Sequence, residues 1–520
     1  MKKARILTVR DYPIAPVPRA LFGSFVEHMG SCVYNGIYQP GHPSADAYGC
    51  RQDVTRLVRE LHLSVIRYPG GNFSSGYNWE DTVGPVRPRR LDLAWRSLEP
   101  NTFGLQEFDR WCKSVGAQTI MTLNMGTRGV DAARNLLEYA NHPGGTAWSD
   151  LRIAHGHPEP YGIRTWCLGN ELDGDWQIAH KTPDEYARLV RQTAHALKQL
   201  DPSLCLIANG SSNNDMRTYP EWDRAVLLSA YDHLDMIATH KYIEKGTMTT
   251  GEYMASVCEL ERQLTEMIAV CDYARAAVRS PRPMMIALDE YMTVNPLNQV
   301  WPTLEHPWQT GVPLCDKAYR FESALVLMQM LLCAMRHCDR VRIACQSMLV
   351  NVSSLIHTTP EGPAWRDVTY YPLQLASAFG AGVAMRSVMQ GSRYDAGRYG
   401  EQDAVDHLVI YREQTEELVV FAVNRTEEPI LLQLEALNYG GSFRLARHVL
   451  YQAELQASNT ADAPDCAAPA AVAVDGEAVV LGPYSIHVLT YAKQRGEERS
   501  SCFSPGQTEA SCSSVARKPS

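Results

Sequence analysis

The chain has 520 residues, of which 45% are hydrophobic and 21% charged, and its net charge is −9. This composition is typical of a globular protein and excludes a disordered or fibrous chain. The charges form no basic block, which disfavours a nucleic-acid-binding protein. No apolar run reaches the length of a membrane span, and the first residues carry no apolar signal segment. We therefore expect a cytoplasmic protein without a membrane partner.

The 14 cysteines are scattered, with no CxxC pair and no spacing typical of a metal-binding finger. Several stand inside apolar runs, among them Cys167, Cys333 and Cys345. We interpret them as small core residues in a reducing compartment. Because no nucleotide or metal motif is present either, we expect neither a metal nor a cofactor.

Short apolar runs alternate with longer amphipathic segments between residues 19 and 385. Eight of the runs are predicted strands, over residues 21–26, 64–68, 118–124, 164–169, 204–209, 235–240, 284–289 and 341–345. Five segments have apolar residues three and four apart and are predicted helices, over 53–63, 105–116, 183–200, 254–278 and 319–338. The second and third helices are predicted to open after Asn101-Thr102 and Thr182-Pro183.

This alternation predicts an α/β fold, a (β/α)₈ TIM barrel over residues 19–385. A doubly wound open sheet is the alternative. That fold is expected to carry a glycine-rich phosphate loop after its first strand, and the glycine-rich stretch YPGGN at 68–72 has the wrong spacing. The barrel is therefore favoured.

The sequence pattern changes after residue 385, where apolar and polar residues alternate with period two. The pattern over 386–492 predicts a C-terminal antiparallel β-sandwich, jelly-roll-like. Residues 1–18 contain a similar stretch and are predicted to add a strand to this sandwich. Residues 493–520 are polar and rich in serine, which predicts a disordered tail.

Polar side chains follow six of the eight predicted barrel strands. In a barrel the C-terminal ends of all strands meet at one mouth, where catalytic residues lie. The residues that the sequence places there are Glu27, Arg67, Asn72, Asn170, Glu171, His240, Tyr242, Asp289, Glu290 and Gln346. We expect these side chains to form one site.

Two carboxylates at one apolar mouth indicate glycoside hydrolysis. That reaction needs one carboxylic acid to protonate the leaving oxygen and one carboxylate to attack the sugar or activate water. Glu171 and Glu290 follow the fourth and seventh predicted strands, which face each other across a barrel. A metal site formed by Glu27, His28 and His240 is a less favoured alternative.

Several long motifs carry a family resemblance. They are FGSFVEHMG (22–30), IRYPGGNFSSGYNWEDTVGP (66–85), RPRRLDLAWRSLEPNTFGLQEF (87–108) and GNELDGDWQIAHKTPDEYARL (169–189). With them the chain resembles the intracellular α-L-arabinofuranosidases of glycoside hydrolase family 51, over roughly residues 1–492. The resemblance implies a barrel with a β-sandwich, a retaining mechanism, removal of terminal arabinofuranosyl groups, and homo-oligomers that are often hexamers.

The same resemblance implies roles for individual residues. Glu171 matches the family's acid/base and Glu290 its nucleophile, while Asn170 matches the amide that contacts the sugar 2-hydroxyl. Arg67 matches a cation that keeps the nucleophile ionised. Residues that match sugar-binding or site-lining positions are Glu27, Asn72, His240, Tyr242 and Gln346.

Since Glu171 must be protonated when substrate binds, we expect its pKa to lie above that of a solvated glutamate, raised by the charge of Glu290.

The chain departs from the family pattern at two places. DEYMTVN (289–295) carries Val294 where the family usually has a tryptophan. At the eighth strand, alignment on LVNV (349–352) puts Met348 at the family's glutamine, whereas a shifted alignment recovers Gln346. The same reaction on a β-xyloside or β-glucan therefore stays an alternative. A non-catalytic carbohydrate-binding barrel is a weaker one, since such a protein has no need to keep both carboxylates.

Overall fold

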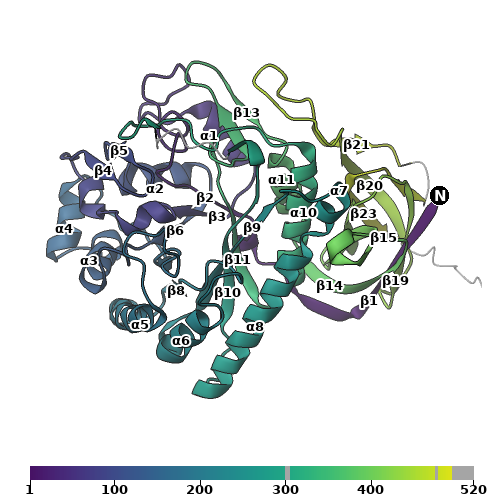
Figure 1. The fold of residues 1–520 in the computed structure, drawn as a ribbon, viewed down its shortest axis with the longest axis horizontal. Helices are drawn as coiled ribbons and strands as arrows, with labels where there is room; N and C mark the ends of the chain where they lie inside the picture. Colours follow the sequence, from purple (N-terminus) through teal and green to yellow (C-terminus); the bar gives the residue numbers. More distant parts are fainter. Residues whose placement is uncertain (299–304, 475–477, 495–520) are drawn as a thin grey trace, which may run out of the picture.

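The computed structural model describes residues 1–298, 305–474 and 478–494. Eight parallel strands form a closed barrel in the order β10-β11-β2-β3-β6-β7-β8-β9 (Figure 1). They are β2 (Gly23–Phe25), β3 (Val65–Tyr68), β6 (Gln118–Thr122), β7 (Thr165–Leu168), β8 (Cys205–Ala208), β9 (Met236–Glu244), β10 (Met285–Val294) and β11 (Val341–Gln346). Each overlaps one predicted strand, so the barrel is confirmed and the doubly wound alternative is wrong.

Helices surround the barrel (Figure 1). They are α1 (Gln52–Glu60), α2 (Leu105–Ser114), α3 (Val130–Asn141), α4 (Ala147–Ala154), α5 (Pro183–Leu200), α6 (Glu221–Ala230), α7 (Thr250–Ala255), α8 (Cys258–Val278), α10 (Phe321–Arg336) and α11 (Tyr370–Phe379). The segment predicted as a single helix over 254–278 belongs to two helices, because residues 256–257 interrupt the helix between α7 and α8. Helix α2 starts at Leu105, as the predicted segment does, and the Glu107 carboxylate accepts the Gly104 N–H there.

Helix α5 shows how the sequence positions a barrel strand. Its start at Thr182-Pro183 is confirmed: the Thr182 hydroxyl accepts the Glu185 N–H, and the Glu185 carboxylate accepts the Thr182 N–H. One turn later, the buried Tyr186 hydroxyl donates to the Leu168 carbonyl at the end of β7 (2.6 Å). The capped helix thereby fixes the strand end from which the Asn170-Glu171 loop departs.

Strands β9 and β10 run further than the sequence predicts. We expected them to end at His240 and at Asp289-Glu290, but they continue to Glu244 and Val294. An irregularity after Ala287 shifts the register, so that Glu290 pairs with His240 and Met292 with Tyr242. A bulge of this kind re-aims side chains. It leaves Glu290 and His240 side by side on rigid sheet rather than in a loop.

A nine-stranded sheet forms the second unit, with strand order β21-β20-β23-β18-β17-β14-β1-β19-β22. Its strands are β1 (Lys2–Pro16), β14 (Val383–Gly391), β17 (Val405–Arg412), β18 (Glu417–Asn424), β19 (Ile430–Leu437), β20 (Phe443–Gln452), β21 (Ala470–Val472), β22 (Val479–Leu481) and β23 (Ser485–Lys493). The sheet curls around its own apolar core (Figure 1). Its pairs are antiparallel except β1 with β19, which is parallel. Most of the predicted tail, residues 495–520, lies outside the described residues.

Helix α10 lies between the barrel and this sheet (Figure 1). It contacts β10 and β11 on one side and β14, β17, β18 and β23 on the other. Every residue from Phe321 to Met335 is buried. A helix covered on all sides needs apolar residues on all faces, which accounts for its sequence ALVLMQMLLCAM.

Candidate active site

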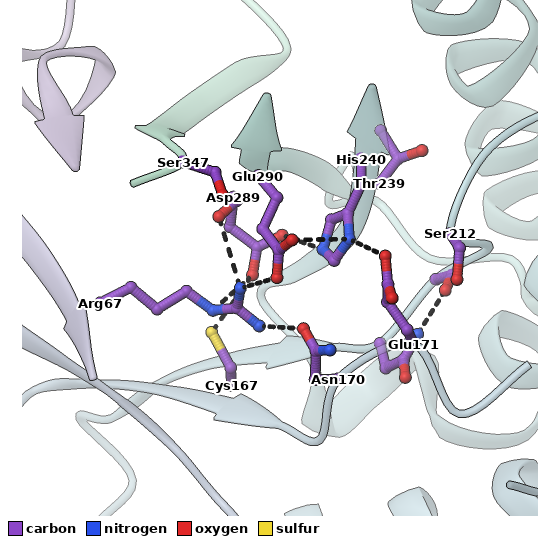
Figure 2. Close-up of polar contacts among 12 residues, drawn as sticks. Arg67, Cys167, Asn170, Glu171, Ser212, Thr239, His240, Asp289, Glu290 and Ser347 are labelled. Atoms are coloured by element: carbon purple, nitrogen blue, oxygen red, sulfur yellow. Dashed lines mark hydrogen bonds and ion pairs between the residues drawn. The ribbon is translucent and has the colours of Figure 1, made fainter. Parts of the chain in front are cut away.

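Arg67, on β3, is the centre of a buried polar cluster (Figure 2). Its guanidinium lies 2.6 Å from Oε1 of Glu290 and 3.2 Å from Oδ2 of Asp289, and it donates to Oδ1 of Asn170 at 2.7 Å. The Arg67 and Asp289 side chains are each 1% exposed. Burial alone would raise the pKa of Asp289, but the nearby Arg67 charge lowers it. One cation thus fixes two carboxylates and the amide beside Glu171.

Glu171 follows β7 in a loop with unusual backbone geometry. Gly169 has φ +99°, and Glu171 itself has φ +44°, a region that non-glycine residues rarely adopt. The turn brings Oε1 of Glu171 to 2.9 Å from Nδ1 of His240. Oε2 accepts a hydrogen bond from Nε1 of Trp176 (2.8 Å).

The pKa of Glu171 is lowered, whereas we expected it to be raised. Burial acts in the expected direction, but the hydrogen bond and charge of His240 outweigh it and lower the pKa of Glu171. The expectation considered only Glu290 as a neighbour, and sequence spacing does not show that an imidazole lies between the two carboxylates.

His240 lies between the two glutamates (Figure 2). Its Nδ1 is 3.7 Å from Oε2 of Glu290, and its Nε2 is 3.2 Å from Oδ1 of Asp289. Burial would lower the pKa of His240, but the charge of Glu290 and the bonds to Asp289 and Glu171 raise it well above its usual range. Oxygens of Glu171 and Glu290 lie within 4.8 Å of one another.

A pair of hydroxyls contacts the other side of Glu290. The Tyr242 hydroxyl lies 2.8 Å from Oε2 of Glu290 and 2.7 Å from Oγ of Ser347. The Tyr242 hydroxyl has one proton, and both Oε2 of Glu290 and Oγ of Ser347 are placed to accept it. Ser347 was not predicted as a site residue, since nothing in its local sequence distinguishes it from other serines.

Glu27 and Asn72 lie on the same side of the mouth as Gly70 and Gly71. Oε1 of Glu27 accepts the Phe73 N–H (2.9 Å) and Nε1 of Trp95 (3.0 Å). Oδ1 of Asn72 accepts from the Asn170 amide (3.2 Å). A Cβ on Gly70 would lie 2.5 Å from Cγ of Glu27, and one on Gly71 would lie 3.0 Å from Oε1 of Glu290. The two glycines are therefore required for close approach of the chain to both carboxylates.

Burial raises the pKa of Glu27 to about 8. An unfolded chain loses this proton near pH 4.5, so the folded protein holds one more proton between about pH 4.5 and 8. Its stability should therefore fall as pH rises through that window, by at most about 1.4 kcal/mol per pH unit. We expect the slope of unfolding free energy against pH to be flatter in Glu27→Gln than in wild type.

Chemical denaturation at pH 5, 6, 7 and 8 measures this difference. Glu80→Gln, which neutralises a partly exposed carboxylate beside Arg128, is the matched control and should keep the wild-type slope. Equal slopes in wild type and Glu27→Gln would show that Glu27 is ionised throughout.

Two predicted residues have other partners. The Gln346 amide accepts from Ser24 (3.1 Å) and contacts the Met292 sulfur (3.3 Å), so its contact with substrate stays a prediction. The two ring nitrogens of His28 form hydrogen bonds with the Glu99 carboxylate (2.9 Å) and the Tyr68 hydroxyl (3.0 Å). Both of its nitrogens are thus engaged away from His240, and the proposed Glu27–His28–His240 metal site is not assembled.

Among the described residues, two groups have ligand atoms close enough for a metal ion: Glu171 with His240 and Glu290, and Glu261 with Cys333 and His337. In the first group, both His240 nitrogens point at carboxylates, and Arg67 already supplies a positive charge. In the second, Arg336 lies 3.8 Å from Glu261. Neither donor set favours a cation. No helix in the described ranges is long and apolar enough to span a membrane.

A closed (β/α)₈ barrel with two neighbouring carboxylates at its mouth defines the class of barrel glycoside hydrolases. Comparison with known proteins agrees with this class. The family model described as the α-L-arabinofuranosidase 1 domain matches residues 57–256, and that of the α-L-arabinofuranosidase C-terminal domain matches residues 289–485. The chain belongs to the α-L-arabinofuranosidases of glycoside hydrolase family 51.

Individual relatives cover nearly the whole chain. The chain is 43% identical over 501 residues to an intracellular exo-α-(1→5)-L-arabinofuranosidase of Bacillus subtilis, covering 95% of this chain and 100% of that protein. It is 39% identical over 446 residues to an exo-α-(1→6)-L-arabinofuranosidase of Bifidobacterium longum, covering 82% and 84%. A solved family 51 α-L-arabinofuranosidase from Bifidobacterium longum superposes with a TM-score of 0.90 at 36% identity, covering 94% and 100%.

Proposed function

We propose that this protein is a retaining exo-α-L-arabinofuranosidase in which Glu290 is the nucleophile and Glu171 the acid/base. One observation carries the mechanism: oxygens of the two glutamates lie within 4.8 Å of one another. Retaining glycosidases hold their carboxyl groups about 5–5.5 Å apart, whereas inverting enzymes need about 6.5–9.5 Å to admit a water. The spacing supports double displacement at a single sugar carbon.

The neighbours of Glu290 fit a nucleophile. Arg67 on Oε1 and the Tyr242 hydroxyl on Oε2 hold the carboxylate in one orientation. In the first step an oxygen of Glu290 bonds to the anomeric carbon while Glu171 protonates the departing oxygen. In the second step Glu171 takes a proton from water, the water oxygen bonds to that carbon, and Glu290 leaves.

The amides beside the carboxylates fit a sugar-binding role. Asn170 is held by Arg67 on its oxygen and bonds Asn72 through its nitrogen, so both amides face the site in fixed orientations. We assign Asn170 to the sugar 2-hydroxyl and Asn72 and Glu27 to the remaining hydroxyls. Hydrogen bonds to the 2-hydroxyl strengthen in the transition state and so raise kcat rather than only binding.

The names of the relatives support a proposal for the natural substrate. We propose terminal α-L-arabinofuranosyl groups of short arabinose-containing oligosaccharides, such as arabinan and arabinoxylan fragments, as substrate. By the same resemblance we propose an intracellular enzyme that forms a homo-oligomer, a hexamer in the family's usual form. The relatives differ in linkage, so (1→5) and (1→6) disaccharides belong in the same test.

A substrate panel tests this function. We expect release of nitrophenol from 4-nitrophenyl α-L-arabinofuranoside at least 100-fold faster than from the β-D-xyloside, and hydrolysis of arabinobioses from the non-reducing end. Proton NMR of the first product should show the α-anomer, because two inversions restore the configuration. Preference for the xyloside would contradict the proposed substrate and indicate a β-xylosidase. An initial β-anomer would rule out double displacement.

A further inference from the structure

We propose that His240 holds the catalytic proton in the free enzyme and passes it to Glu171 as Glu290 attacks the sugar. The inference rests on the proposed roles of the two glutamates and adds a third residue to the proton path. It explains how Glu171 can act as an acid even though its surroundings favour its ionised form.

The contacts of the imidazole carry the argument (Figure 2). Nδ1 lies 2.9 Å from Oε1 of Glu171, and Nε2 lies 3.2 Å from Oδ1 of Asp289. Asp289 is ionised by its pairing with Arg67, and its Oδ1 faces Nε2 as an ion-pair partner, which favours a proton on Nε2. Nδ1 and Oε1 of Glu171 are at hydrogen-bond distance, and two atoms that both lack a proton would repel each other there. This contact therefore contains one further proton, on either Nδ1 or Oε1. The pair therefore stores one transferable proton, whichever atom holds it.

The position of this proton depends on the charge of Glu290. Oε2 of Glu290 lies 3.7 Å from Nδ1, so its negative charge stabilises the imidazolium. When Glu290 bonds to the anomeric carbon, its carboxylate becomes a neutral ester, and the imidazolium loses a close counter-ion. The proton is then better held by Glu171, which is the group that faces the leaving oxygen. Nucleophilic attack and acid catalysis are thereby coupled through one side chain.

The protons balance over the full cycle. In the first half the Nδ1 proton moves to Glu171 and on to the glycosidic oxygen, as the bond from that oxygen to carbon breaks and the Glu290 ester forms. His240 is then neutral. In the second half Glu171 removes a proton from water, the water oxygen displaces Glu290, and the proton returns to Nδ1. Each cycle consumes one water and leaves the enzyme unchanged.

Leaving-group dependence tests the proposal. kcat/KM is measured for phenyl and 2,4-dinitrophenyl α-L-arabinofuranoside with wild type, His240→Gln, His240→Asn, Glu171→Ala and Asn72→Ala. The dinitrophenolate leaves without a proton, whereas the phenolate needs one. We expect His240→Gln to lose at least 100-fold on the phenyl substrate and less than 10-fold on the dinitrophenyl substrate. Asn72→Ala, which removes a sugar-binding amide that takes no part in the proton path, should lower both values by the same factor.

The variants separate the two proposals. Glu171→Ala must show the same discrimination if Glu171 is the acid; equal losses there would overturn the proposed role of Glu171. Discrimination in Glu171→Ala but not in either His240 variant would overturn the proton path alone. Circular dichroism confirms that each variant is folded.

A second measurement observes the proton itself. In ¹⁵N-histidine-labelled enzyme, the His240 signals, assigned by their absence in His240→Gln, should show an imidazolium in the free state. They should show a neutral ring after trapping with a 2-fluoro arabinofuranoside. An imidazolium in both states would contradict the coupling.

Discussion

Glu290→Ala should lower kcat on 4-nitrophenyl α-L-arabinofuranoside by roughly 10⁵-fold or more, the scale on which removal of a covalent nucleophile acts. The variant keeps Asn170, Asn72 and Glu27, which we assign to the sugar hydroxyls, so sugar binding should persist while the first chemical step stops. The cavity left by the carboxylate gives a small anion access to the anomeric carbon. Added azide should therefore restore nitrophenol release and yield an arabinosyl azide of inverted configuration.

Asp289→Ala is the matched control for this experiment. Asp289 is the preceding residue, is also buried and also pairs with Arg67 and His240, but it is not placed to attack. Azide should not restore its activity. Rescue of Asp289→Ala instead of Glu290→Ala would reassign the nucleophile.

Arg67→Met should reduce stability at pH 7 by about 3–5 kcal/mol, because it removes the guanidinium that pairs with two buried carboxylates and leaves His240 as their one nearby cation among the described residues. In wild type the pKa of Asp289 is lowered, so its stabilising charge is present at neutral pH. That stabilisation is lost as the pH falls below the pKa of an ordinary aspartate and through the lower pKa of Asp289. In Arg67→Met, burial is no longer offset and protonation relieves the unpaired charge. The stability difference from wild type should therefore shrink from pH 7 to pH 4.

Arg152→Met provides the comparison. Arg152 is fully buried too, but among the described residues it donates to five backbone carbonyls and to no carboxylate. Its replacement should cost stability by a similar amount at pH 7 and at pH 4. Denaturant unfolding at the two pH values measures both variants, and an Arg67→Met loss that is independent of pH would contradict the ion-pair assignment.

The barrel could be predicted from the sequence because its strands are short, apolar and separated by amphipathic helices. Local pattern determines such elements, and Thr182-Pro183 also predicted the start of α5. The ends of β9 and β10 could not be predicted. Their continuation past His240 and Glu290 depends on a register shift between neighbouring strands, which is a property of the pairing rather than of either segment.

The candidate site was predictable in composition but not in geometry. Strand ends and the family motifs identified Arg67, Asn170, Glu171 and Glu290 together, and the structure brings these four within one cluster. The position of His240 between the glutamates depends on three-dimensional packing, and so the direction of the Glu171 pKa was wrong. Trp176 lies within a family motif and Ser347 does not, but each contributes a single contact that depends on the folded geometry.

Trapping of the glycosyl-enzyme tests most directly whether Glu290 forms a covalent bond with arabinose. The enzyme is incubated with 2,4-dinitrophenyl 2-deoxy-2-fluoro-α-L-arabinofuranoside, and intact mass and peptide mass spectra are recorded. The mechanism predicts a burst of one dinitrophenolate per active site and one fluoroarabinosyl group on the peptide that carries Glu290. Steady turnover without an adduct, or a label on any other residue, would contradict it.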